Sequence, residues 1–194
     1  LFRRQPPAQW SDMLGLGAVR RSEMKAFSAV ALAPFESYMR RGGKCLRSLL
    51  ACAVLEAYGR RVRQFLPLVG MMEVLESSTI LIDDFIDNSP FRRGKPSAHL
   101  IYGLEGAAAS ALAIYYGSWN IFSRRLLPIT RRAETEAWRW LARGHLRTCL
   151  GQIEELGFMR RRKHLTLLEY MNSVRNHIAT LSFAAPLYLP ALAC

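Results

Sequence analysis

Three acidic and two basic residues near the middle of the chain have the types and spacing that could do chemistry. They end a long apolar segment and begin the loop after it: Asp83, Asp84, Asp87, Arg92 and Arg93. On a helix, Asp83 and Asp87 lie four positions apart and share one face, so their carboxylates repel unless a cation lies between them. Such oxygen donors suit Mg²⁺ that also binds a substrate phosphate, and arginines form paired hydrogen bonds to phosphate. The cluster therefore predicts a diphosphate site that contains Mg²⁺.

A solvated surface cluster is the alternative explanation for these charges. The acids, however, emerge from the apolar residues 80–82 and enclose Phe85 and Ile86. Acids at a helix C-terminus also oppose the helix dipole. Because acidic residues are seldom buried without a partner, we favour a binding site.

A second basic group begins an earlier predicted helix. Gly42 and Gly43 allow a tight turn, and Lys44 and Arg47 face the same way from the first helical turn. The free N–H groups of a helix N-terminus bind phosphate. By itself this pattern is often a plain turn, but two basic groups with a metal-binding acid cluster imply two diphosphate groups.

Helical periodicity dominates the sequence, and no alternating β-branched run competes with it. The predicted helices cover residues 28–39, 46–58, 66–87, 107–125, 134–156 and 165–181. They predict an all-α bundle that forms one domain over residues 1–194, with side chains projecting into a central site.

The composition indicates which classes of partner and which cellular location to expect for the protein. The net charge is +12, but the arginines occur as scattered pairs without a basic stripe interleaved with aromatics, so we expect no nucleic-acid partner. The four cysteines lack a metal-binding spacing and no signal peptide is visible, which favours a cytoplasmic protein. Polar residues dilute the apolar run 106–123, which we interpret as a core helix and not an integral membrane segment. Residues 187–192, close to the end of the given sequence, are apolar, and we expect a further C-terminal portion.

Four motifs, in order along the chain, resemble those of the trans-isoprenyl diphosphate synthases, also called polyprenyl synthetases. They resemble that family's GGKxxR motif, its first aspartate-rich motif with a trailing basic pair, its GQxxD segment and its Tyr…Lys-Thr helix. In that order they occupy residues 42–47, 83–87 with 92–96, 151–155 and 170–181. The resemblance runs from about residue 34 to the end and implies an isoprenoid-synthase-type helical bundle with a central diphosphate and Mg²⁺ site.

The activity that this resemblance implies is head-to-tail prenyl transfer from an allylic diphosphate to isopentenyl diphosphate. Mg²⁺ held by Asp83, Asp84 and Asp87 would draw diphosphate off the allylic substrate and leave an allylic carbocation. The departed pyrophosphate would take the final proton, so no side-chain base is required. The resemblance also makes a homodimer the expected assembly.

The resemblance also assigns the two diphosphate seats. Isopentenyl diphosphate would be bound by Lys44, Arg47 and Arg93, and Arg92 would help to hold the allylic diphosphate. Catalysis would come mostly from positioning and from electrostatic stabilisation of developing charge.

The helix before the aspartates is expected to line the hydrocarbon tail. Bulky aromatics at the positions of Ser78 and Thr79 stop chain growth early in the resembling family, whereas small residues permit it. These residues therefore predict a C20 or longer product, with Leu75 as a deeper floor.

Some positions depart from the family pattern. Glu76 stands where the family has a His or Gln that touches isopentenyl diphosphate, and His177 with Ile178 stands in place of the Lys-Thr that touches the allylic diphosphate. Gln152 matches and is expected to contact substrate, whereas Glu155 replaces an Asp. The family's second aspartate-rich motif would fall past the last residue of the sequence.

Two other functions stay open. A terpene cyclase on the same bundle would act on one allylic diphosphate, and Glu76 favours it because an acid repels a second diphosphate. A non-catalytic subunit of a prenyl synthase would tolerate the changes at Glu76 and His177, but the intact aspartate set argues against that role.

Overall fold

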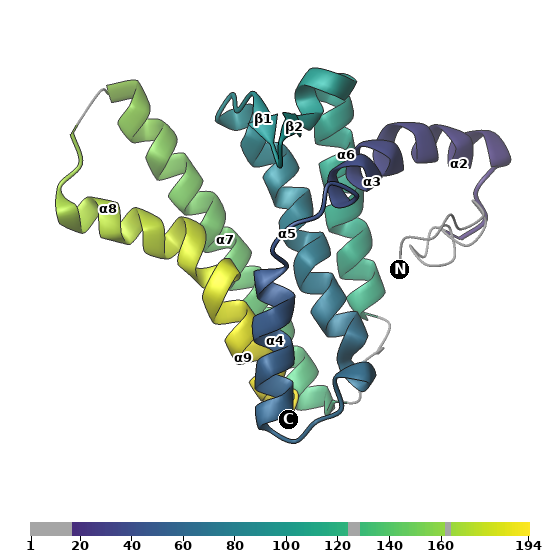
Figure 1. The fold of residues 1–194 in the computed structure, drawn as a ribbon, viewed down its shortest axis with the longest axis vertical. Coiled ribbons are helices and arrows are strands. Elements are labelled where there is room, and N and C mark those ends of the chain that lie inside the picture. Colours follow the sequence, from purple (N-terminus) through teal and green to yellow (C-terminus); the bar gives the residue numbers. More distant parts are fainter. Residues whose placement is uncertain (1–16, 124–128, 162–163) are drawn as a thin grey trace. The chain divides into compact units, whose positions relative to one another are not determined.

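The computed structural model describes residues 17–123, 129–161 and 164–194, and nearly all of its regular structure is helical (Figure 1). This confirms the prediction of an all-α fold. The described residues group into two compact units, one made of residues up to 45 with 73–126 and the other of 46–72 with 127–194. The prediction of a single domain over residues 1–194 stays a prediction, and the two units are described in turn.

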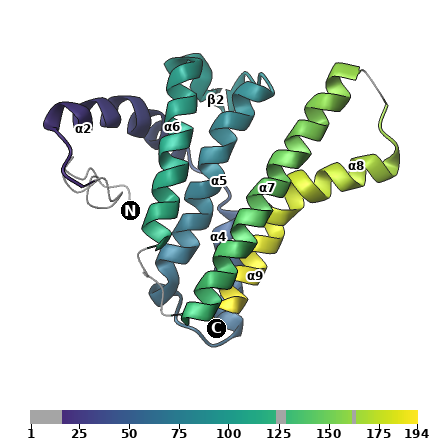
Figure 2. The same cartoon turned by 180° about the vertical axis from the view of Figure 1, so that it is seen from behind.

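The first unit contains the aspartates and the arginines that follow them. Helices α5 and α6 lie side by side in Figures 1 and 2, and residues 73–86 of α5 belong to this unit. Its elements are α2 (Arg21–Phe27), the π-helical η1 (Ser28–Leu32), α3 (Ala33–Met39), α5 (Leu66–Ile86), β1 (Phe91–Arg92), β2 (Lys95–Pro96) and α6 (Ala98–Ser123).

The core of this unit combines large side chains of α2, η1, α3 and α5 with three alanines of α6. The buried cluster consists of Met24, Leu32, Phe35, Tyr38, Leu81, Ala98, Ala107, Ala111 and Ile114. Helix α6 begins earlier than the predicted start at residue 107, and it is kinked at Gly103, whose φ of 77° is non-helical. The β1–β2 hairpin was not predicted, because strands of two residues carry no periodic signal.

The second unit is built around the long helix α7. Its elements are α4 (Leu46–Ala57), the 3₁₀ turn η2 (Val62–Phe65), the first turns of α5, α7 (Arg131–Arg161), α8 (Leu167–Val174), the π-helical η3 (Arg175–Ala184) and α9 (Ala185–Leu192). A capping box of Thr166 and Glu169 begins α8. The π-helical η3 leads directly into α9, which contains Pro186 and Pro190, so the helical path continues beyond the predicted end at residue 181.

Apolar helices raise the question of membrane insertion. Among the described residues, Val62–Ile86 is long and apolar enough to cross a membrane by length and composition, but half of its most apolar window is buried inside the protein. A core helix passes the same test, and this one carries Glu73, Glu76, Asp83 and Asp84.

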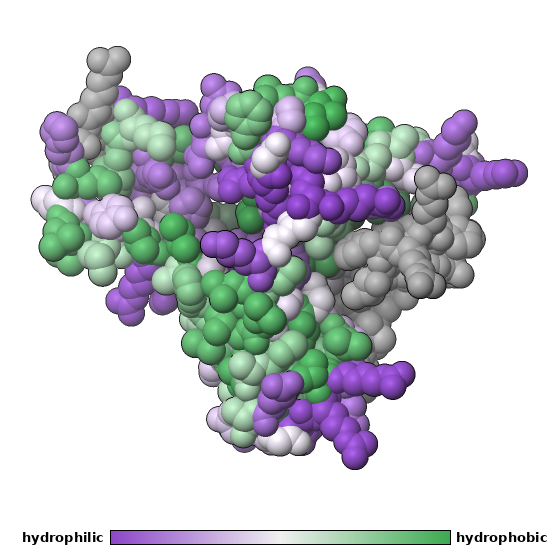
Figure 3. Space-filling view, viewed as in Figure 1, coloured by the Kyte–Doolittle hydropathy of each residue, from purple (hydrophilic) through white to green (hydrophobic). Residues whose placement is uncertain are grey.

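The apolar side chains seen in Figure 3 gather over α4, whose Leu46 and Leu49 are exposed.

Candidate diphosphate and metal site

The end of α5 has a defined geometry that separates the three aspartates. The N–H of Ser89 donates to the carbonyl of Asp84 at 2.8 Å and the N–H of Asn88 donates to that of Phe85 at 3.2 Å. Asn88 has a φ of 53°. This pair of bonds across a left-handed residue is the Schellman motif that ends many helices. Asp87 therefore lies just past the helix and is exposed, whereas Asp84 lies within it and is buried.

Two arginines reach the same region from the β1–β2 hairpin. Arg92 pairs with Lys95 across the hairpin, so Arg93 and Gly94 form its two-residue turn, with φ values of 53° and 73°. Positive φ at both positions is the signature of the type I′ turn, which seldom has arginine at its first position. The hairpin is held by Arg41, whose Nη1 donates to the carbonyls of Arg92 at 3.2 Å and Pro96 at 2.8 Å.

Asp84 and Arg92 form a partly buried ion pair. Arg92 donates from Nε to Asp84 Oδ1 at 2.8 Å and also from Nη2 to the same oxygen. The side chain of Asp84 is 1% exposed and that of Arg92 is 34% exposed. Asp84 Oδ2 is buried without a hydrogen-bond partner. The hydrogen bond to Asp84 raises the pKa of Arg92, so the guanidinium stays charged.

Arg93 is held between an aromatic ring and a glycine. Its Cζ lies 4.2 Å from the centroid of the Tyr38 ring. A Cβ placed on Gly43 would meet Arg93 Cζ and Nη2 at 3.0 Å, so the glycine leaves the space that the guanidinium occupies. Burial raises the pKa of the Tyr38 hydroxyl, and the nearby Arg93 opposes that rise. The Gly-Gly-Lys loop and the hairpin are thus joined through Arg93.

The placement of the aspartates bears on how they would bind the predicted Mg²⁺. Among the residues that the structure describes, no three His, Cys, Asp or Glu side chains gather closely enough to hold one metal ion. Asp84 is buried and its Oδ1 accepts from Arg92, whereas its Oδ2 has no hydrogen-bond partner. Asp83 is half-buried and Asp87 is exposed one turn later, and such carboxylates suit a hard cation whose other ligands are water and phosphate. Binding by all three aspartates stays a prediction.

The remaining predicted phosphate ligands are divided between the two units. Lys44 is exposed and belongs to the first unit, directly after Gly43. Arg47 lies in the first turn of α4 in the second unit, where its Nη2 donates to Ser182 Oγ at 2.7 Å. Their shared role at one diphosphate stays a prediction.

The residues expected to line the hydrocarbon tail lie on α5 before the aspartates. Ser78 is fully buried and donates to the carbonyl of Leu75 at 2.6 Å, and Thr79 donates to that of Glu76 at 2.9 Å. These hydroxyls are satisfied within the helix and leave small side chains at both positions. Glu76 is half-buried on α5, and its charge adds to the rise in the pKa of the Tyr38 hydroxyl, which Arg92 and Arg93 oppose.

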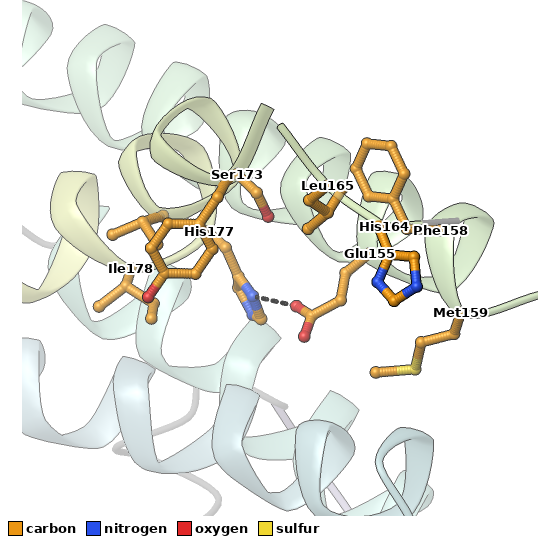
Figure 4. A pocket seen from close by; sticks show the side chains of 10 residues that line it. Glu155, Phe158, Met159, His164, Leu165, Ser173, His177 and Ile178 are labelled. Carbon is orange, nitrogen blue, oxygen red and sulfur yellow. Dashed lines mark hydrogen bonds and ion pairs between the residues drawn. The ribbon is translucent and has the colours of Figure 1, made fainter. Parts of the chain in front are cut away.

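A pocket of about 620 Å³ lies within the second unit, between the end of α7 and the segment α8–η3 (Figure 4). Figure 4 shows His177 pointing at Glu155, and His177 Nδ1 lies 3.1 Å from Glu155 Oε2. The predicted residues His177, Ile178 and Glu155 all line the pocket, whereas Gln152, half-buried on α7, does not. A histidine beside a carboxylate could hold an anion when it is protonated.

The packing of α7 against η3 depends on a glycine. A Cβ on Gly151 would lie 2.7 Å from the backbone nitrogen of His177, so any side chain there would push η3 away. The structure thus gives the first residue of the GQxxD-like segment a packing role. The spacing of the motif gave no sign of it, because the neighbour lies in a distant part of the sequence.

Tyr38 and Arg41 were missed as site residues. Tyr38 lies near the end of the predicted helix 28–39, where an aromatic residue usually means core, and Arg41 follows that helix, where an arginine usually means a solvated surface. Tyr38 and Arg41 belong to the site because they contact the β1–β2 hairpin, which the sequence did not indicate.

Helical packing and the acid–arginine pair at the end of α5 together define the class: an all-α protein with a candidate diphosphate site. The sequence model described as polyprenyl synthetase matches residues 28–194. The chain therefore belongs to the polyprenyl synthetase family.

Named relatives agree with this assignment. The geranylgeranyl diphosphate synthase of Methanosarcina mazei is 29% identical over 150 residues, which cover 74% of this chain and 44% of that protein. The farnesyl diphosphate synthase of Buchnera aphidicola is 31% identical over 136 residues, covering 68% of this chain and 46% of that protein. The chain thus spans about half the length of the relatives that it matches.

Solved structures show the same fold. The geranylgeranyl pyrophosphate synthetase of the archaeon Geoglobus acetivorans has a TM-score of 0.77 at 22% identity, covering 96% of this chain and 56% of that one. The polyprenyl synthase of Caulobacter crescentus CB15, solved in complex with calcium and isoprenyl diphosphate, has a TM-score of 0.72 at 24% identity, covering 96% and 52%. The isoprenoid-synthase type of the predicted fold is confirmed.

Proposed function

We propose that this chain belongs to a trans-prenyltransferase that condenses isopentenyl diphosphate head to tail with an allylic diphosphate in the presence of Mg²⁺. The product is a C20 or longer polyprenyl diphosphate. The contact between Arg93 and Gly43 carries the proposal, since it joins the Gly-Gly-Lys loop to the hairpin that follows the aspartates. This contact supports the proposal that two basic elements distant in sequence bind substrate together.

In this proposal each side chain has a defined task. Lys44, Arg47 and Arg93 bind the diphosphate of isopentenyl diphosphate and orient its double bond. Arg92 gives two donors to Asp84 and keeps others for the allylic diphosphate. Asp83 and Asp87 hold the metal, which supplies Lewis-acid stabilisation of the leaving diphosphate when bound.

Further residues are assigned to the allylic substrate in this proposal. His177 and Gln152 are proposed to contact its diphosphate, with Glu155 orienting the imidazole of His177. The small residues Ser78 and Thr79 leave room for a growing chain, and Leu75, 3% exposed, limits its depth. Thr79→Phe should shorten the product, whereas Thr79→Ser should leave its length unchanged.

The assembly and location are part of the same proposal. Leu146, Leu150 and Ile153 lie on one face of α7 and are 72%, 48% and 65% exposed, an apolar stripe that a second copy of the chain would cover. We expect a homodimer that acts in the cytoplasm. Light scattering of Leu146→Glu/Ile153→Glu against wild type tests the dimer, and an unchanged mass would contradict this interface.

One experiment tests the function. The whole protein is incubated with Mg²⁺ and farnesyl diphosphate, with and without isopentenyl diphosphate, and the products are read by mass spectrometry. Diphosphates longer by five-carbon steps that form only with isopentenyl diphosphate are the expected result. No elongation under any condition would contradict the proposal.

A terpene cyclase is the second candidate, because Glu76 places an acid on the helix that carries the aspartates, and an acid repels a second diphosphate. It would release a hydrocarbon or an alcohol from farnesyl diphosphate without isopentenyl diphosphate. A non-catalytic subunit would form no product alone and would change the product length of a catalytic partner when mixed with it.

A further inference from the structure

We propose that Tyr38 is a positioning residue for isopentenyl diphosphate, acting by holding the guanidinium of Arg93 in one orientation. This inference rests on the proposed function. Neither the motifs nor the family match assigns a role to Tyr38.

The ring of Tyr38 is a fixed surface. Its side chain is 1% exposed and belongs to the buried cluster that includes Phe35 and Leu81. Arg93 lies over its face at 4.2 Å, close enough for a cation–π attraction. A ring that cannot move gives the guanidinium a fixed plane.

Gly43 is the second residue that lies close to the guanidinium of Arg93. A side-chain carbon there would lie 3.0 Å from both Cζ and Nη2 of Arg93. The backbone φ of Gly43 is not in the left-handed region, so the conformation alone does not require glycine. The close approach of Arg93 gives a physical reason for glycine at this position.

The backbone of Arg93 supports a functional reading of this contact. Its φ of 53° places a long side chain at a turn position that usually carries Asn, Asp or Gly. Local strain of this kind persists where the surrounding structure over-determines it. The ion pair of Arg92 with Asp84 and the bonds from Arg41 to the hairpin supply that constraint.

Orientation matters because a guanidinium binds phosphate through a planar fork. Tyr38 and Gly43 hold the guanidinium of Arg93 in one orientation before the substrate arrives. The Arg93 side chain therefore loses less rotamer freedom when the substrate binds. Loss of the ring should therefore weaken binding of isopentenyl diphosphate and leave the chemical step unchanged.

The test is steady-state kinetics of the whole protein, with each substrate varied separately. Tyr38→Leu should raise the KM for isopentenyl diphosphate about tenfold, in keeping with a partly desolvated cation–π contact. The kcat and the KM for the allylic diphosphate should change less than about twofold. Tyr38→Phe, which keeps the ring, should restore the KM for isopentenyl diphosphate.

Two further variants separate positioning from core packing. Gly43 lies on an exposed loop, so Gly43→Ala should raise the KM for isopentenyl diphosphate without lowering Tm. Adding Tyr38→Leu to Arg93→Gln should give no further rise, because Tyr38 acts through Arg93. An unchanged KM in both Tyr38→Leu and Gly43→Ala would overturn the inference, and so would a fully additive double variant.

The inference is distinguishable from the proposed function. If wild type forms no elongated product, calorimetric titration with isopentenyl diphosphate takes the place of kinetics. Weaker binding by Tyr38→Leu and normal binding by Tyr38→Phe then support the positioning role, and equal binding by all three proteins overturns it.

Discussion

Arg92 and Asp84 are joined by two donated hydrogen bonds that end on one carboxylate oxygen, at the point where α5 gives way to the hairpin. The acid is 1% exposed and the base 34% exposed. This geometry divides the three aspartates into one that holds the hairpin and two that remain at the helix end. The division has consequences for both stability and activity.

Removal of Arg92 should destabilise the fold more than removal of an ordinary surface charge. Arg92→Ala leaves the Asp84 carboxylate buried without its partner, and we expect a loss of about 2–3 kcal/mol, less than for a wholly buried pair. Urea denaturation measures this loss of unfolding free energy. Lys95→Ala, an exposed cation of the same hairpin, is the control and should change stability by less than about 0.5 kcal/mol. Equal stability of the two variants would contradict the structural role.

Asp83→Ala and Asp87→Ala should show the opposite pattern. Neither carboxylate is deeply buried, so the unfolding free energy should change little. Mg²⁺-dependent turnover should fall more than about a hundredfold because the metal loses a ligand. Turnover assayed across a Mg²⁺ titration checks this, and undiminished activity in either variant would remove that residue from the proposed site.

Glu76 should oppose the second diphosphate. Glu76→His removes an acid of α5 that would repel a bound diphosphate, and we expect a several-fold lower KM for isopentenyl diphosphate with little change in kcat. Glu73→Gln, which removes the same charge three positions earlier on α5, is the matched control. A KM that stays the same or rises in Glu76→His would show that Glu76 lies away from this substrate.

Two glycines of α7 should respond oppositely to alanine. Gly151→Ala brings a carbon to 2.7 Å from the His177 nitrogen, and the overpacking should cost about 1–3 kcal/mol. Gly157 has nothing within 4 Å of a built Cβ, so Gly157→Ala should stabilise the helix by about 0.5–1 kcal/mol. Thermal unfolding compares them, and equal shifts would mean that α7 and η3 are not closely packed at Gly151.

Acid should destabilise the protein through His145. Burial lowers the pKa of this imidazole, whose side chain is hydrogen-bonded at 2.8 Å to the Leu141 carbonyl. Because the folded pKa lies below the unfolded one, the unfolded state binds the proton more readily, and stability is lost as pH falls from about 6.5 towards the folded pKa. In urea titrations between about pH 5 and pH 7.5, His145→Leu should show a shallower pH dependence than wild type. An identical slope would mean that another group causes the acid sensitivity.

Much of the fold could be predicted from the sequence. The helical period and the Asp83–Asp87 spacing are local properties, and local geometry fixes which residues share a helix face. Helix ends were less predictable, as α6 shows by beginning at Ala98 with a kink at Gly103. The kink depends on one glycine dihedral, which a periodic pattern does not report.

The sequence by itself determined that the chain is all-helical, that its acids and arginines cluster at the end of a helix, and that it resembles prenyl synthases. The tertiary structure alone decided which acid pairs with which base. It buried Asp84 against Arg92, laid Arg93 on Tyr38 beside Gly43 and brought His177 to Glu155. The physical reason is that these contacts join residues from separate elements, and their energies depend on distance and burial, which spacing along the chain does not encode.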